Sequence, residues 1–136
     1  MEQKPLRILI LDDEPIVCKR LQPALEKNGY EVEIFTSSME AVQRFRKAQF
    51  DIVVTDLKMK ELDGLQFLTE VKDSSPNTEV IVITGFATME TAKESFRKGG
   101  FDFLSKPFKI GEMLEVIKRA EAKVRQRQAE SPSREG

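Results

Sequence analysis

Five polar side chains in this sequence have the chemistry to accept and hold a phosphoryl group. They are two adjacent acids, a third acid, a hydroxyl and an ammonium: Asp12, Asp13, Asp56, Thr84 and Lys106. Carboxylates that crowd together repel one another, so they attract a hard cation with oxygen ligands, and Mg²⁺ or Mn²⁺ suits such a set. A carboxylate can then act as a nucleophile and form an aspartyl phosphate. The hydroxyl and the ammonium would hold the phosphoryl oxygens, because phosphoryl transfer depends mainly on positioning and charge stabilisation.

Each of these residues has an ordinary explanation when it is taken alone. An Asp-Asp pair before a helix usually caps that helix, and Asp56 could cap a loop. Thr84 would be an ordinary strand residue and Lys106 an ordinary surface lysine. What indicates a site is their common position, because each of the five stands where a predicted strand ends.

The elements that would position these residues alternate between strand and helix along the chain. Apolar, β-rich runs predict the strands, and acidic, serine and glycine residues mark where helices begin and end. Three of the strands are continuous apolar runs, which is typical of strands buried on both faces. We expect strands at residues 7–11, 32–35, 51–55, 79–84 and 101–105, each followed by a helix that begins near residue 15, 38, 64, 88 or 111.

Short strands that alternate with helices predict parallel βαβ units with right-handed crossovers. The fold class is therefore α/β, a three-layer sandwich with helices on both faces of a parallel sheet. In open sheets of this kind ligands bind beyond the carboxyl ends of the strands. The five polar side chains would meet at that edge.

The length of the chain suits one domain, and its balanced charge gives no general attraction to nucleic acid or anionic lipid. We expect the domain to span residues 1–120 of the 136, and the polar residues 121–136 to be a fraying helix end followed by a flexible tail or linker. Lys and Arg number 22 against 23 Asp and Glu, so the charge does not favour direct nucleic acid binding. The basic residues after position 117 fit a solvated helix end, which the helix dipole favours.

Several features that the sequence lacks limit the expected location of the protein and the reactions that it can carry out. No apolar run approaches the ~20 residues of a membrane helix and no signal-peptide pattern is present, so we expect no membrane contact and a cytoplasmic location. The single Cys18 excludes an internal disulfide. Because the sequence has no histidine, it has no Ser-His-Asp triad and cannot itself carry a phosphohistidine. Any phosphohistidine donor must be another molecule.

Four segments resemble the receiver domains of two-component response regulators: ILILDDE, DIVVTDLKMKELDG, VIVITG and FDFLSKPF. The resemblance covers roughly residues 6–120. Within it, residues 83–108 look most like receivers attached to NtrC-type transcription activators or to sensor kinases. The resemblance implies a flavodoxin-like (βα)5 fold with strand order 2-1-3-4-5, and a phosphorelay switch rather than an enzyme. Its implied partners are a histidine kinase or phosphotransfer protein, and a homodimer or effector domain docked on the fourth helix, fifth strand and fifth helix.

The same resemblance implies roles for individual residues. Asp56 would be the phosphoacceptor, and Asp13 and Asp56 would bind the cation directly, with the Lys58 backbone carbonyl. Asp12 would act mostly through water. The other implied roles are phosphoryl contact by Thr84 and Lys106, an aromatic switch at Phe103, a cis peptide bond before Pro107, and tuning of dephosphorylation by Lys58 and Phe86.

Two positions depart from the family's pattern. Lys60 stands where proline is frequent, which leaves the shape of the loop after Asp56 open. Phe103 stands where tyrosine is frequent, so its ring can rotate but has no hydroxyl to bond.

Two other functions deserve comparison with the switch. A phosphohydrolase of the haloacid dehalogenase type needs a second Asp two residues after its nucleophile, whereas Lys58 follows Asp56 and Glu14 follows Asp12 at that distance. A flavodoxin-like cofactor domain would stack its flavin on aromatic residues, but the chain has one Tyr and no Trp. It also has no Gly-rich phosphate loop after the first strand. The sequence favours the switch.

Overall fold

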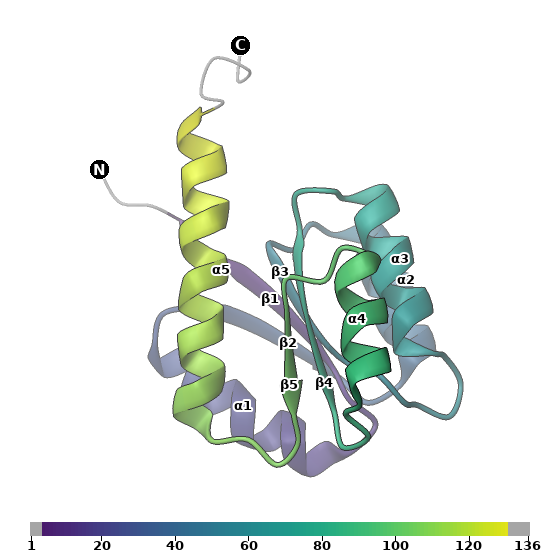
Figure 1. The fold of residues 1–136 in the computed structure, drawn as a ribbon. Coiled ribbons are helices and arrows are strands. Elements are labelled where there is room, and N and C mark those ends of the chain that lie inside the picture. The colour runs from purple at the N-terminus through teal and green to yellow at the C-terminus, as the bar shows by residue number, and fades with distance from the viewer. Residues whose placement is uncertain (1–3, 131–136) are drawn as a thin grey trace.

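The computed structural model describes residues 4–130, in which five strands and five helices alternate (Figure 1). The order is β1 (Arg7–Leu11), α1 (Pro15–Lys27), β2 (Glu31–Phe35), α2 (Ser38–Lys47), β3 (Ile52–Asp56), α3 (Gly64–Ser74), β4 (Glu79–Thr84), α4 (Met89–Arg97), β5 (Asp102–Ser105) and α5 (Ile110–Glu130). The strands pair in parallel in the order β2-β1-β3-β4-β5. The predicted flavodoxin-like α/β sandwich is confirmed.

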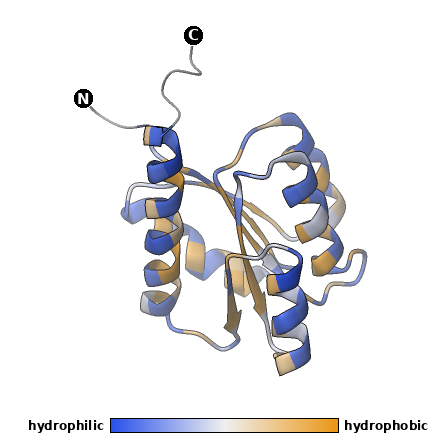
Figure 2. Ribbon diagram, turned by 45° about the horizontal axis from the view of Figure 1, so that its top comes forward, coloured by the Kyte–Doolittle hydropathy of each residue, from blue (hydrophilic) through white to orange (hydrophobic). Residues whose placement is uncertain are grey.

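Two apolar cores lie on opposite faces of the sheet. Successive strand residues point to opposite faces, so Ile8 and Ile10 of β1 join one core while Leu9 and Leu11 join the other. The first core is completed by α1 and α5, and the second by α2 and α3. Figures 1 and 2 show these helices flanking the apolar strands, with α4 at the side of α3. This double burial explains why the central strands are continuously apolar.

Local capping signals fix where several helices begin. The Ser37 side chain accepts the Glu40 backbone N–H at the start of α2, and Asp63 accepts the Leu65 N–H at the start of α3. Thr88 begins α4 with a reciprocal capping box. Each cap satisfies backbone donors that lack a partner within the helix. The helices therefore begin directly after the loops that leave the carboxyl ends of the strands.

The last helix is longer than the sequence analysis expected. It continues to Glu130, past residue 120 where the domain was predicted to end. Val124 is buried one turn after Ala120, so the apolar stripe of α5 extends beyond that boundary. The tail predicted beyond Glu130 lies outside the described residues. Within residues 4–130, no helix is long and apolar enough to cross a membrane.

Candidate phosphorylation site

The five polar residues singled out in the sequence meet at the carboxyl edge of the sheet. Asp12 and Asp13 follow β1, Asp56 ends β3, Thr84 ends β4, and Lys106 follows β5. One carboxylate oxygen from each of the three acids lies within 4.8 Å of the other two. The parallel strand register brings these chain positions together, although more than 40 residues separate the first acids from the third.

Lys106 is the cation at the centre of this site. Its Nζ lies 2.7 Å from Asp12 Oδ2, 2.7 Å from Glu14 Oε1 and 3.3 Å from Asp56 Oδ2. Burial lowers the pKa of the lysine, but the hydrogen bonds and charges of the surrounding acids outweigh burial and raise it above its ordinary value. Lys106 therefore stays protonated, and its ammonium links Asp12, after β1, to Asp56, at the end of β3.

Asp56 is buried at the end of β3, and both of its carboxylate oxygens accept hydrogen bonds. Its Oδ1 accepts the backbone N–H of Leu57 at 2.7 Å, and its Oδ2 accepts from Lys106. Burial raises the pKa of Asp56 to about 6, and the charge of Asp12 adds to this while Lys106 opposes it. The pKa of Asp12 is also raised, mainly by burial. Two buried carboxylates beside one ammonium leave excess negative charge, which a bound cation would neutralise.

The donor set fits a hard divalent cation. Asp12 Oδ2 is fully buried and has no hydrogen-bond partner among the residues that the structure describes. Lys106 approaches this oxygen at 2.7 Å, but without the alignment of a hydrogen bond. Together with half-buried Asp13 and with Asp56 it offers carboxylate oxygens. Oxygen ligands of this kind suit Mg²⁺ or Mn²⁺ rather than a softer metal.

Thr84 ends β4 and keeps a hydroxyl hydrogen that is free to donate. It is completely buried, and its Oγ1 accepts the backbone N–H of Phe86 at 3.0 Å. A hydroxyl that accepts one hydrogen bond still has its own hydrogen to donate. The backbone N–H of Lys106 donates to the Thr84 carbonyl at 2.8 Å, which ties the ends of β4 and β5 together.

Comparison with known proteins decides which family this site belongs to. The sequence profile of the response regulator receiver domain matches residues 8–118. The chain belongs to the response regulator receiver domains. Members of this family are phosphoacceptor switches of two-component signalling, so the phosphohydrolase and flavin-binding alternatives are set aside.

Individual relatives point to the NtrC-type branch. The chain is 36% identical over 126 residues to the transcriptional regulatory protein ZraR of Salmonella typhimurium, covering 93% of this chain and 29% of ZraR. It is 37% identical over 114 residues to the regulatory protein AtoC of Escherichia coli, covering 84% of this chain and 25% of AtoC. The receiver thus spans less than a third of these curated relatives.

Solved receiver structures share the fold. The beryllofluoride-activated NtrC4 receiver domain dimer superposes with a TM-score of 0.83 and 35% identity, covering 87% of this chain and 98% of that one. A CheY-like receiver domain protein from Methanospirillum hungatei gives a TM-score of 0.84 and 28% identity, covering 90% and 98%.

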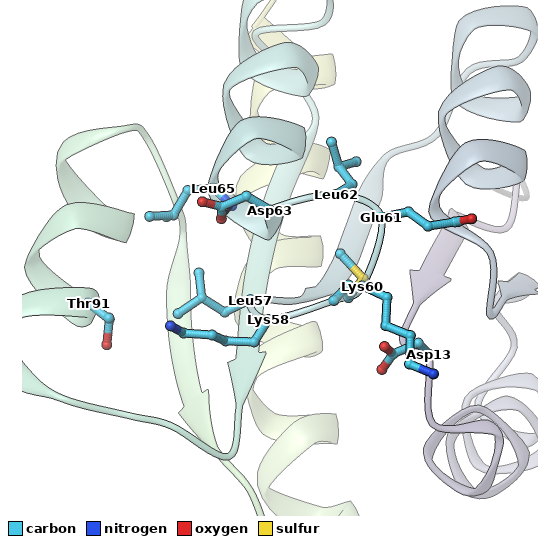
Figure 3. Close-up of a pocket in the computed structure, with 10 residues that line it drawn as sticks. Asp13, Leu57, Lys58, Lys60, Glu61, Leu62, Asp63, Leu65 and Thr91 are labelled. Carbon is cyan, nitrogen blue, oxygen red and sulfur yellow. Dashed lines mark hydrogen bonds between the residues drawn. The ribbon is translucent and has the colours of Figure 1, made fainter.

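The loop between β3 and α3 borders the acidic cluster of this receiver. Figure 3 shows the Lys60 side chain extending toward Asp13, and the Lys58 side chain extending the other way, toward Thr91. The loop closes at Gly64, whose backbone N–H donates to the Leu57 carbonyl at 2.9 Å. The replacement of proline by Lys60 therefore leaves a closed loop and adds a cation beside the candidate metal ligands.

The remaining predicted site residues lie on or shortly after β4 and β5. The peptide bond between Lys106 and Pro107 is cis, as predicted. Phe103 is half-buried on β5 and packs against the core formed with α2 and α3. Phe86 is 67% exposed and lines a cavity that also contains Asp56 and Lys58.

Two residues at this site have contacts that the sequence did not reveal. Glu14 was expected only to mark a helix start, yet its carboxylate binds Lys106. Its position directly after the acid pair was the available signal. Gly64 was expected only as a turn, yet a Cβ there would lie 2.1 Å from the Asp56 carbonyl oxygen. The start of α3 can approach the end of β3 this closely because Gly64 has no side chain.

Proposed function

We propose that Asp56 accepts a phosphoryl group from the phosphohistidine of a histidine kinase or phosphotransfer protein. The observation that carries this proposal is the convergence of three strand-end carboxylates within 4.8 Å, with Lys106 joining Asp12 to Asp56. Such a donor implies the cytoplasm as the working compartment.

The chemistry needs one nucleophilic oxygen and stabilisation of negative charge. An Asp56 carboxylate oxygen forms a bond to phosphorus while the bond from phosphorus to the donor atom breaks, and the donor keeps that electron pair. Lys106 and the Thr84 hydroxyl donate hydrogen bonds to phosphoryl oxygens, where negative charge accumulates. The Leu57 N–H holds the other Asp56 oxygen and so orients the nucleophile.

We assign the cation to Asp13 and Asp56 as direct ligands, with the Lys58 backbone carbonyl and with Asp12 acting through water. When bound, Mg²⁺ or Mn²⁺ supplies electrostatic neutralisation of phosphoryl oxygens. The three carboxylate oxygens within 4.8 Å of one another and the oxygen-only donor set support this assignment.

Lys58 and Phe86 would tune the lifetime of the aspartyl phosphate. Both line a cavity that also contains Asp56, and a bulky, exposed Phe86 ring would hinder water that attacks the aspartyl phosphate. We expect Phe86→Ala to speed the decay of the phosphorylated form, measured after the donor is removed. An unchanged or slower decay would contradict this role.

The output surface would be formed by α4, β5 and α5, and would dock a second receiver or an effector domain. Thr84 would move toward the phosphoryl group and Phe103 would rotate into the vacated space, because an empty space in a packed core is costly. NtrC4 supports a dimer as one output, since its beryllofluoride-activated receiver is a dimer.

Intact-mass measurement tests the nucleophile. With acetyl phosphate and Mg²⁺, the wild-type chain should gain one phosphoryl group and Asp56→Asn none. Asp73→Asn is the matched control, because Asp73 is exposed on α3 and away from the cluster. Equal labelling of the Asp56 variant would refute the assignment.

A further inference from the structure

Glu14 forms an ion pair with Lys106 that takes no part in the proposed phosphoryl transfer. It is the N-cap residue of α1, and its Oε1 lies 2.7 Å from Lys106 Nζ. The Glu14 side chain is 59% exposed, whereas the Lys106 side chain is 13% exposed. An exposed carboxylate thus reaches inward to a nearly buried ammonium.

This contact occupies one hydrogen of the lysine. A lysine ammonium has three hydrogens to donate, and Lys106 already donates to Glu14 and Asp56 while Asp12 lies beside it as an ion-pair partner. Glu14 and Asp12 each approach at 2.7 Å, while Asp56 lies at 3.3 Å. The ammonium therefore sits closer to the β1 acids than to the residue that would carry the phosphoryl group.

We propose that Glu14 is a positioning residue that restrains phosphorylation by holding Lys106 until a phosphoryl group displaces it. The inference rests on the proposed role of Asp56. A phosphoryl group on Asp56 brings new anionic acceptors, so Lys106 must turn toward them and loosen its contacts with the β1 acids. Asp12 is buried, and an unpaired buried charge is costly, whereas the Asp56 carboxylate loses its own charge when it forms the acyl phosphate. Glu14 can turn into solvent at little cost, so it is the partner that leaves.

The charge of Glu14 opposes phosphorylation for a second reason. While Glu14 remains on Lys106, its carboxylate lies beside the position of the incoming anion and repels it. Glu14→Gln removes this repulsion and frees a lysine donor. Since exposed ion pairs are weak, we expect phosphorylation to become about three- to fivefold faster.

The test compares Glu14→Gln with Glu115→Gln, which removes the same charge from an exposed position on α5. The measurements are the initial rate of acetyl phosphate labelling by intact mass, and the affinity for beryllofluoride at saturating Mg²⁺. Both should increase in Glu14→Gln and stay at the wild-type value in Glu115→Gln. An unchanged or lower rate and affinity in Glu14→Gln would overturn the proposal.

A second background distinguishes action through Lys106 from simple repulsion. In Lys106→Met, where labelling is followed over longer times, adding Glu14→Gln should change the rate far less than it does in the wild type. An equal increase in both backgrounds would show that Lys106 does not mediate the effect, and would overturn the positioning role. The Glu14 side chain makes no capping hydrogen bond, so the variant should fold normally, which its urea midpoint checks.

Failure of this inference is separable from failure of the proposed function. If labelling persists in Asp56→Asn, the phosphoacceptor is wrong and the Glu14 role falls with it. If Asp56 alone is labelled, and equally fast with and without the Glu14 carboxylate, the positioning role alone is wrong.

Discussion

At the scale of single residues, burial of Asp56 has two opposite effects on its reactivity as a nucleophile. A carboxylate must be ionised to attack phosphorus, yet burial and Asp12 raise the pKa of Asp56 to about 6. Lys106 opposes that shift, and a cation between the acids would oppose it further. Burial still helps the chemistry, because hydrogen bonds to a developing charge are stronger where water is excluded.

The two acids after β1 should differ in their importance for the cation. We expect Asp13→Ala to weaken Mg²⁺ binding by more than about tenfold, since Asp13 is the assigned direct ligand, and Asp12→Ala to weaken it less. Calorimetric titration of both variants with Mg²⁺ measures this. An Asp13→Ala variant with wild-type affinity would remove Asp13 from the ligand set.

Residue types at strand ends were predictable from the sequence, but side-chain contacts were not. Asp12, Asp56 and Lys106 were found because acids and a lysine directly follow apolar strands, and parallel strands end at one edge. The Glu14 contact depends on which way a long, exposed side chain turns. Residue order does not determine that choice, so nothing in the sequence favours a contact with Lys106 over solvent.

At the scale of elements, the loop after β3 depends on a close backbone approach. A Cβ on Gly64 would lie 2.1 Å from the Asp56 carbonyl oxygen and 2.7 Å from Leu57 Cα. We expect Gly64→Ala to destabilise the fold by about 1–3 kcal/mol, the usual cost of overpacking, as measured by urea unfolding. Gly111→Ala is the control, since a Cβ at Gly111 meets nothing within 4 Å. Equal stability of the two variants would refute the close approach.

A second element-scale prediction concerns Glu33, which joins β2 to α2 and β1. Its carboxylate accepts two hydrogen bonds from Arg44, at 2.8 and 2.9 Å, and one from Arg7 at 3.0 Å. The Arg44 hydrogen bonds lower the pKa of Glu33; burial opposes them and Arg7 assists. A lowered folded-state pKa stabilises the fold above the unfolded pKa of about 4.3, and this stabilisation is lost as the pH falls.

Glu33→Gln should therefore cost about 0.5–1 kcal/mol at pH 7, because the group is partly exposed. The difference from wild type should shrink steadily as the pH falls below about 4. Urea unfolding at several pH values measures it. Glu31→Gln is the control, since Glu31 is 61% exposed and lies 3.8 Å from Arg7. A cost for Glu33→Gln that did not change with pH would contradict the electrostatic origin.

At the scale of the whole molecule, side chains of α5 bind both the start of β4 and Tyr30, the residue before β2. Arg127 near its end binds the buried Glu79 at 2.7 Å, where β4 begins. The Tyr30 hydroxyl donates to Glu121 at 2.7 Å. A domain end at residue 120 was predicted because the following residues are polar. Glu79 and Tyr30 contact the later turns of α5 but are distant in sequence, so residue order did not reveal them.

Activation should travel from Asp56 across the whole molecule to the face formed by α4, β5 and α5. We expect Thr84 and Phe103 to connect the two regions, because Thr84 ends β4 opposite Ser105 of β5, and Phe103 also lies on β5. We expect amide NMR shifts on adding beryllofluoride and Mg²⁺ to extend from the strand-end loops to all three elements. Asp56→Asn, treated identically, should show only the effects of the cation.

The packing of α4 favours such a response, since Ser95 is its one buried residue and so little apolar surface holds the helix in place. Shifts confined to the loops around Asp56 would disprove this output route while leaving the phosphoacceptor untouched, because transfer to Asp56 needs only the strand-end residues.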